Sequence, residues 1–200
     1  MKSTTAGCGV VLFLLAATFV RGAVGEWEKT SGPAGVSGQA GAEIHQVAVS
    51  PQNRALALAA GRSGPFLTPS AGGDWFAVTA AEFAPAGNEW HAAAIHPANP
   101  LVMYLSDENH GLIFRSADAG ASWQPLSWVG KRHDLVLDSM FVDKANPRHL
   151  VVGAWVLGDV DGGIYVSNDA GHTWTDEPEM RGQSIRSQIG GDFEASFEFA

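Results

Sequence analysis

Carboxylates are the residues of this 200-residue chain whose type could support hydrolytic chemistry. A glycoside hydrolase needs two of them across the scissile bond, about 5–5.5 Å apart for a retaining mechanism and further apart for an inverting one. Sequence spacing does not determine whether any two carboxylates converge in this way, so we assign no catalytic residue. The candidates, which lie in predicted loops or at predicted strand ends, are Glu43, Asp107, Glu108, Asp134 and Asp138.

Histidines could supply metal ligands, and the chain contains 7 of them. None belongs to an H-x-H or H-x-x-x-H pair, and the single cysteine, Cys8, lies near the N-terminus. His91 and His96 are five residues apart around a predicted strand and turn, which should point them in different directions. We therefore predict structural or surface histidines, no metal site and no cofactor.

Exposed tryptophans could bind a sugar or a peptide by stacking. Trp155 lies in an apolar run and is expected to pack in the core, whereas Trp90 and Trp128 lie near predicted loops. We keep Trp90 and Trp128 as candidates for a ligand surface. The partner class expected from them is a protein or a carbohydrate.

A repeated octet of residues must position these candidates. It reads S-x-D-x-G-x-[ST]-W at 116–123 and at 167–174, and a degenerate copy at 68–75 has Ser70 in place of the aspartate. The tryptophans that end the three octets are 48 and 51 residues apart, and Trp27 lies 48 residues before the first of them. A constant period near fifty residues predicts a repeat architecture.

Each octet is expected to form a tight turn between two strands. The aspartate can accept hydrogen bonds from backbone N–H groups, and the glycine adopts a positive φ at little steric cost. The tryptophan then opens the next strand and packs into the core. The residues with these structural roles are Ser116, Asp118, Gly120, Trp123, Ser167, Asp169, Gly171 and Trp174, with Gly72 and Trp75 in the degenerate copy.

The octets resemble the Asp-box, also called the bacterial neuraminidase repeat, which lies between the third and fourth strands of blades in many β-propellers. The resemblance implies an all-β fold of four-stranded blades. It implies no single activity, because such propellers include sialidases, xyloglucan-cleaving hydrolases, sortilin-type receptors and photosystem II assembly factors. A sialidase would need a tyrosine nucleophile and an arginine cluster, yet the only tyrosines, Tyr104 and Tyr165, lie inside predicted strands.

A second feature repeats in the same register. Asn53, Asn99 and Asn146 are 46 and 47 residues apart and are expected to form turns between the first and second strands of each repeat. Short apolar runs bounded by proline, glycine or asparagine are typical of strands. Such runs predict strands at 44–49, 55–60, 66–67, 75–78, 91–95, 102–105, 112–115, 123–128, 137–142, 150–156 and 163–166, with a further strand opened by Trp174.

The predicted fold is therefore all-β, a partial β-propeller of about three four-stranded blades with incomplete ends. The repeats span about 43–80, 90–128 and 135–176, with a partial repeat at 182–200, within a domain at 26–200. Propellers usually have four to eight blades. We therefore expect a fragment of a longer gene product, a truncated or frameshifted product, or a subunit that closes by self-association through open blade faces.

The first 25 residues are predicted to be a signal peptide. The apolar run at 10–20 is too short to span a bilayer and suits a signal-peptide core. Cleavage after Gly22 or Gly25 fits the small residues there, and an uncleaved anchor is the alternative. We expect a secreted or periplasmic chain without a membrane span after cleavage and without a lipid anchor.

The formal net charge of -9 argues against binding to nucleic acid. The sequence thus predicts an exported repeat module that acts as a binding or scaffold domain without catalysis. The alternative is part of a sialidase-like or xyloglucanase-like glycoside hydrolase that acts on polysaccharide.

Overall fold

The computed structural model describes residues 32–33, 43–83, 89–107, 110–131, 134–156 and 162–176. The predicted signal peptide, Trp27, the candidate Glu108 and the partial repeat at 182–200 lie outside the described residues. Structural statements below refer to the described part of the chain.

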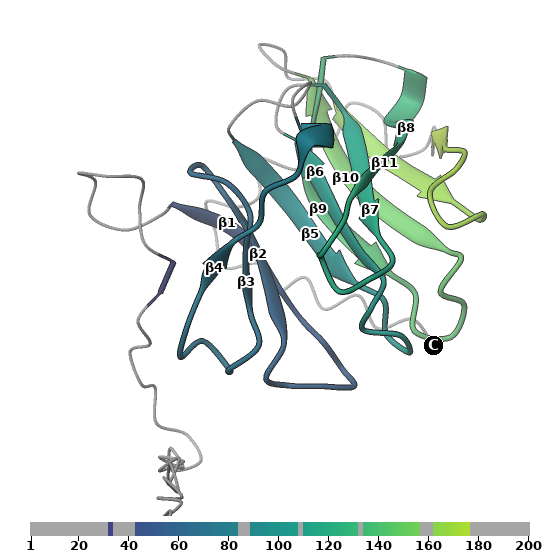
Figure 1. Ribbon diagram of the computed structural model, residues 1–200. Helices are drawn as coiled ribbons and strands as arrows, with labels where there is room; N and C mark the ends of the chain where they lie inside the picture. The colour runs from purple at the N-terminus through teal and green to yellow at the C-terminus, as the bar shows by residue number, and fades with distance from the viewer. Residues whose placement is uncertain are drawn as a thin grey trace, which may run out of the picture.

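Three four-stranded antiparallel sheets form the described fold, which confirms the predicted all-β class and partial propeller (Figure 1). In each sheet, strands that are adjacent in sequence are also neighbours in space. The first sheet contains β1 (Ile44–Val49), β2 (Ala57–Gly61), β3 (Phe66–Thr68) and β4 (Phe76–Ala77). The second contains β5 (Trp90–Ile95), β6 (Met103–Asp107), β7 (Leu112–Ser116) and β8 (Gln124–Trp128). The third contains β9 (Leu135–Val142), β10 (Leu150–Val156), β11 (Gly162–Ser167) and β12 (Thr175–Asp176).

Two short 3-10 turns, η1 (Ala81–Phe83) and η2 (Val129–Lys131), follow the outer strands of the first two sheets. Neither was predicted from the sequence. Over the described ranges, no helix has the length and apolar character needed to cross a membrane.

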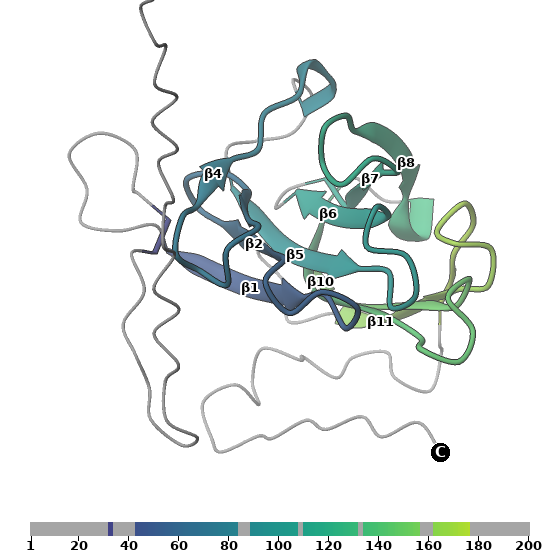
Figure 2. The same ribbon diagram turned by 60° about the horizontal axis from the view of Figure 1, so that its bottom comes forward.

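The first strands of the sheets, β1, β5 and β9, pack side by side and are the inner strands of the fold (Figure 1). Figure 2 shows β1 alongside β5. Every residue of β5 is buried, because β1 covers it on one side and β9 on the other. The fourth strands are mostly exposed. The second sheet therefore runs from a covered inner strand to a solvated outer one, whereas β1 of the first sheet is partly exposed.

The second sheet has a hydrophobic core on each face, because successive side chains of a strand point to opposite faces. Ala92 and Ala94 of β5 and Tyr104 of β6 pack toward the third sheet. On the other face, Trp90 and Met103 pack toward the first sheet. Successive residues of β5 are therefore buried, because its sheet is covered on both faces.

Both regular octets form the same hydrogen-bonded turn. Asp118 Oδ1 accepts the backbone N–H of Ser122 at 2.8 Å, and Asp118 Oδ2 accepts the Ser122 hydroxyl at 2.6 Å. The hydroxyl of Ser116 donates to Asp118 at 2.8 Å and accepts the backbone N–H of Gly120 at 2.9 Å. The octet at 167–174 repeats these four bonds at similar distances. One carboxylate and two hydroxyls therefore fix the turn.

The degenerate octet has the same geometry with neutral groups. Thr68 Oγ1 accepts the backbone N–H groups of Ser70 and Gly72 at 3.2 and 3.0 Å. Ser70 Oγ accepts the backbone N–H of Asp74 at 2.8 Å, which is the bond that the aspartate makes in the regular octets. A carboxylate at position 70 would lie beside the carboxylate of Asp74, so the serine avoids a like-charge contact.

The octets and the asparagine turns are joined directly. An alanine with positive φ precedes the octet glycine in every copy, a conformation that the sequence did not lead us to expect at a non-glycine residue. The backbone N–H of this alanine donates to the carbonyl of the residue two positions after the turn asparagine. The N–H of that carbonyl-bearing residue donates in turn to the asparagine side chain. The three carbonyl pairs are Ala71 with Ala55, Ala119 with Leu101 and Ala170 with Arg148.

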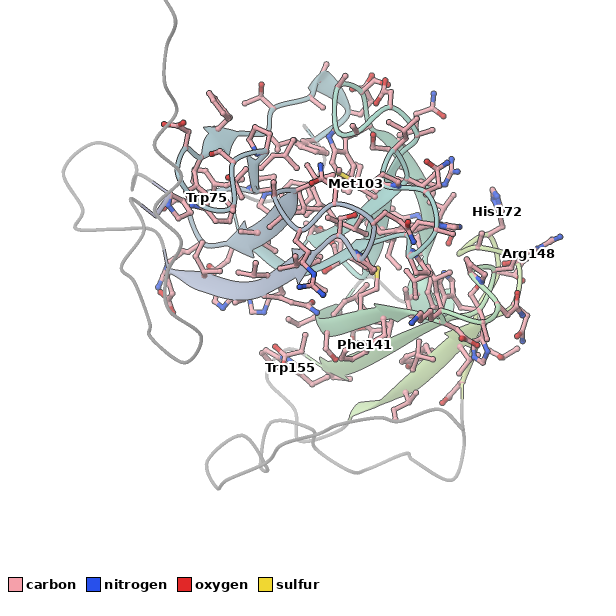
Figure 3. All side chains as sticks on the ribbon, turned by 90° about the horizontal axis from the view of Figure 1, so that it is seen from below. Trp75, Met103, Phe141, Arg148, Trp155 and His172 are labelled. Atoms are coloured by element: carbon pink, nitrogen blue, oxygen red, sulfur yellow. The ribbon has the colours of Figure 1, made fainter. Side chains whose placement is uncertain are left out.

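The tryptophans of the two regular octets face the preceding sheet. Trp174 Nε1 donates to Ser127 Oγ of β8 at 2.9 Å, and a Cβ on Gly171, whose φ is 89°, would meet Leu126 at 2.6 Å. Trp123 is 1% exposed, whereas Trp75 is only partly buried. Trp174 is likewise only partly buried, although it contacts the second sheet. Figure 3 shows Trp75 on the opposite side of the molecule from His172 of the third octet.

We predict that Asp169→Asn lowers the melting temperature at neutral pH by roughly 2–4 °C. The hydroxyl and backbone N–H of Thr173 lower the pKa of Asp169 to about 2, from 3.8. This depressed pKa adds stability above about pH 4 that is lost as the pH falls toward about 2. Thermal unfolding followed by circular dichroism should show the deficit of the variant shrinking over this window. Asp74→Asn is the matched control, and a deficit of equal size at all pH values would contradict the prediction.

We also predict that Ser70→Asp stabilises the chain only when Asp74→Ser accompanies it. The double variant recreates the regular octet, whereas the single variant places two carboxylates together. A double-mutant cycle on chemical unfolding measures the coupling between the two positions. Additive effects of the two substitutions would show that the octets are not equivalent.

Candidate functional site

Each inner strand contains one β-bulge near its beginning. His45 is the extra residue of β1, His91 lies within the irregular stretch of β5, and Asp138 is the extra residue of β9. A bulge bends the strand and redirects a side chain, and bulges are common beside functional sites. The three bulged residues therefore come from equivalent places in three sheets.

Gln46, next to the first bulge, connects all three inner strands. Its Oε1 accepts the backbone N–H of Ala93 in β5 at 3.0 Å, and its Nε2 donates to the carbonyl of Met140 in β9 at 3.3 Å. One amide side chain thus satisfies two backbone groups at the irregular part of the neighbouring strands.

Ser106 of β6 also bonds to the backbone of the inner strands β5 and β9. Its hydroxyl accepts the backbone N–H of Ala92 at 2.9 Å and donates to the carbonyl of Leu137 in β9 at 3.2 Å. Ser106 is fully buried. Because a buried backbone group without a partner is costly, these side-chain bonds allow the bulges to exist inside the fold.

The bulged residues meet in what we call the inner-strand cluster, consisting of His45, Glu89, His91 and Asp138. The rings of His45 and His91 are stacked, with centroids 4.1 Å apart and planes inclined by 12°. Glu89 Oε1 lies 3.3 Å from His45 Nε2 and 3.8 Å from His91 Nε2. Asp138 Oδ1 lies 3.4 Å from the other nitrogen of His91, Nδ1.

The inner-strand cluster is partly accessible. The His91 side chain is 7% exposed, whereas those of His45, Glu89 and Asp138 are 20–21% exposed. Arg62 Nε lies 3.8 Å from the second oxygen of Glu89, and Arg62 also pairs with Glu43 at 3.4 Å. Arg62 and Glu43 are about 60% exposed, so their pair contributes little to stability.

A second polar group, Asp107 with His110, lies at the same edge of the sheets. Asp107 pairs with Trp90 at the start of β5, so both groups occupy what we call the strand-start edge, where β1, β5 and β9 begin. Asp107 accepts the backbone N–H of Leu112 at 3.0 Å and contacts His110 Nδ1. Burial raises the pKa of Asp107, and the hydrogen bond to His110 opposes that rise.

The two tryptophans expected at a ligand surface have different positions. Trp128 is 36% exposed at the strand-start edge, and its ring lies 6.4 Å from that of His110 in an edge-on arrangement. Trp90 is 2% exposed and packs against Phe83 and Phe114. This corrects the expectation for Trp90, whose indole fills the core between the first and second sheets and presents no surface to a ligand.

The remaining candidates that the structure describes have different partners. Glu43 is exposed beside Arg62, and Asp134 is exposed just before β9. Asp107 and Asp138 belong to the two separate polar groups of the strand-start edge. Both tyrosines are buried, Tyr104 at 1% and Tyr165 at 8%, which leaves neither accessible as a sialidase nucleophile.

The inner-strand cluster was not predicted, because its histidines form no local pair in the sequence. The signal that could have found it is the repeat period. His45, His91 and Asp138 are 46 and 47 residues apart, like the turn asparagines, and each lies eight residues before one of them. By contrast, His91 and His96 lie at opposite ends of β5, where His96 Nδ1 accepts the backbone N–H groups of a turn.

Comparison with known proteins identifies similar folds. No family model matches the sequence, and no curated protein matches it. A GH74 enzyme from Niastella koreensis is 19% identical with a TM-score of 0.53, covering 68% of this chain and 22% of that chain. A GH74 xyloglucanase from Xanthomonas campestris is 21% identical with a TM-score of 0.50, and the match covers 68% of this chain and 20% of the xyloglucanase. An auxiliary nutrient binding protein from Bacteroides thetaiotaomicron is 13% identical with a TM-score of 0.50, and the match covers 70% of this chain and 32% of the binding protein.

These similarities place the chain among β-propeller folds and extend no further than the fold. The chain spans about a fifth to a third of the length of these structures. Enzymes and a binding protein share the architecture, so the fold does not decide between catalysis and binding.

We predict that Gln46→Ala reduces the free energy of unfolding by about 1–3 kcal/mol, the cost of a buried N–H group left without a partner. Urea unfolding measures this loss. Gln124→Ala, at an exposed position of β8, is the matched control and should change stability by no more than about 0.5 kcal/mol. Equal stability of the two variants would show that the Gln46 hydrogen bonds do not stabilise the packing of the inner strands.

Proposed function

We propose that the chain is an exported β-propeller module of the Asp-box type that binds a polysaccharide at the strand-start edge without cleaving it. The observation that carries this proposal is the exposed indole of Trp128 beside the Asp107–His110 pair. The C–H groups of a sugar can pack on an aromatic face, and neighbouring polar groups can fix the sugar's hydroxyls. The apolar run at 10–20 supports export.

The arrangement of carboxylates favours binding over hydrolysis. Glu89 and Asp138 are the two described carboxylates of the inner-strand cluster, and each lies against a different ring nitrogen of His91. An imidazole therefore occupies the region between them. A glycosidase needs that region for the sugar and, in an inverting mechanism, for a water molecule.

The second candidate function is that of a glycoside hydrolase. The fold similarity to two GH74 structures is the observation in its favour, together with carboxylates at the strand-start edge. In that case Glu89 or Asp138 would act on a sugar bound after His91 moves aside. The two functions differ in whether polysaccharide is consumed.

Xyloglucan, which the Xanthomonas campestris structure is named for cleaving, is the first polysaccharide to test. We expect it to retard the full chain in native affinity electrophoresis, and we expect no release of reducing ends. Trp128→Ala should weaken the retardation at least tenfold in the polysaccharide concentration required. Phe76→Ala, which removes an exposed aromatic ring from the outer strand β4, is the matched control and should bind as the wild type does.

Release of reducing ends that disappears in Glu89→Gln would favour the hydrolase. Unretarded migration in xyloglucan and in other soluble β-glucans would contradict polysaccharide as the ligand class and leave a protein ligand as the alternative. Equal retardation of the wild type and Trp128→Ala would show that the strand-start indole is not the binding surface.

A further inference from the structure

We propose that His45, Glu89 and His91 form a binding site for a divalent transition-metal ion that joins the first and second sheets. The site is independent of the proposed polysaccharide binding, because Trp128, His110 and Asp107 are not among its ligands. His45 comes from β1, whereas Glu89 and His91 lie immediately before and within β5. An ion held by all three would therefore connect two sheets.

The donor atoms are close enough for one ion. One ligand atom from each residue lies within 4.8 Å of the other two. A tetrahedral zinc ion has ligands at about 2.0–2.2 Å, which places its donor atoms roughly 3.3–3.6 Å from one another. The separations of Glu89 Oε1 from the two Nε2 atoms, 3.3 and 3.8 Å, match that spacing to within a few tenths of an ångström.

The orientation of His45 also favours a shared ion over a direct bond. His45 Nε2 is shielded from solvent and makes no hydrogen bond within the described residues, although Glu89 Oε1 is 3.3 Å away. The two atoms are thus near each other without being aligned as donor and acceptor. Such an arrangement is expected when a nitrogen lone pair and a carboxylate oxygen face a common point.

The residues around the ligands hold them as outer-shell partners hold metal ligands in proteins. A histidine that binds a metal through one nitrogen usually donates its other N–H to a carboxylate or carbonyl. Asp138 lies 3.4 Å from His91 Nδ1 and can accept that N–H, which leaves Nε2 for the ion. Arg62 lies 3.8 Å from Glu89 Oε2 and leaves Oε1 directed toward the histidines.

The ligand types select the class of ion. Two imidazoles and one carboxylate suit zinc and the other later first-row divalent ions, whereas magnesium and calcium prefer oxygen ligands. Three protein ligands leave one tetrahedral position open, as in zinc sites of the His₂Glu type. The side chains of His45 and Glu89 are about one-fifth exposed, so an ion could enter from solvent.

Isothermal titration calorimetry with Zn²⁺ tests the site on the full chain after dialysis against EDTA. We expect one Zn²⁺ per chain and a melting temperature that rises with Zn²⁺ concentration, because an ion that binds only the folded state stabilises it. His45→Ala and Glu89→Gln should each weaken binding at least tenfold and abolish the Zn²⁺-dependent rise. Asp138→Asn should weaken binding about 10–100-fold through the orientation of His91.

His172→Ala is the matched control, since His172 is exposed in the third octet and lies at the periphery (Figure 3). It should bind Zn²⁺ as the wild type does, and Mg²⁺ should not raise the melting temperature. Melting curves in EDTA identify any variant that fails to fold. If His45→Ala does not fold, the Zn²⁺ affinity of the conservative Glu89→Gln variant tests the site. A wild type that binds no Zn²⁺, or affinity unchanged in Glu89→Gln, would overturn the proposal. Xyloglucan retardation in EDTA distinguishes failure of this site from failure of the proposed function.

Discussion

The hydrogen bonds that Gln46 and Ser106 make to the backbone of neighbouring inner strands are the interactions on which the candidate site depends. The bulges of β1, β5 and β9 interrupt regular pairing, and buried backbone groups must then find other partners. Gln46 supplies partners in β5 and β9, and Ser106 supplies partners in the same two strands. The bulged residues are thereby held in fixed positions at one edge of the sheets.

The two edges of the sheets have different physical roles. At one edge, octet hydroxyls and carboxylates, or two hydroxyls in the degenerate copy, close the turn between the third and fourth strands. The backbone N–H of the octet alanine bonds to the turn between the first and second strands. Backbone N–H groups of the same turn donate hydrogen bonds to these hydroxyls and carboxylates. At the strand-start edge, the carboxylates of Glu89 and Asp138 instead meet histidines from other parts of the chain. Local bonding therefore leaves the octet aspartates unsuited to chemistry, while long-range packing assembles the polar clusters.

The strand order and most strand positions could be predicted because each relies on local patterns. The strand at 44–49 and the strand at 150–156 have the predicted bounds, and most others differ by one or two residues. The 3-10 turns were missed because they contain no sequence signal of their own. Trp90 was misjudged because a residue near a loop in sequence can still be covered by the neighbouring sheet, as Phe83 and Phe114 cover it here.

The sequence by itself determined the repeat, the octet turns and the all-β class, since all three follow from side chains acting on backbone within a few residues or from a constant period. Only the tertiary structure decided which repeated positions converge. His45, His91 and Asp138 share a register that is visible in the sequence, yet their meeting with Glu89 requires the inner strands to lie side by side. Residues nearly fifty positions apart come within 4 Å because sheet packing brings equivalent strands together, and no local pattern encodes that distance.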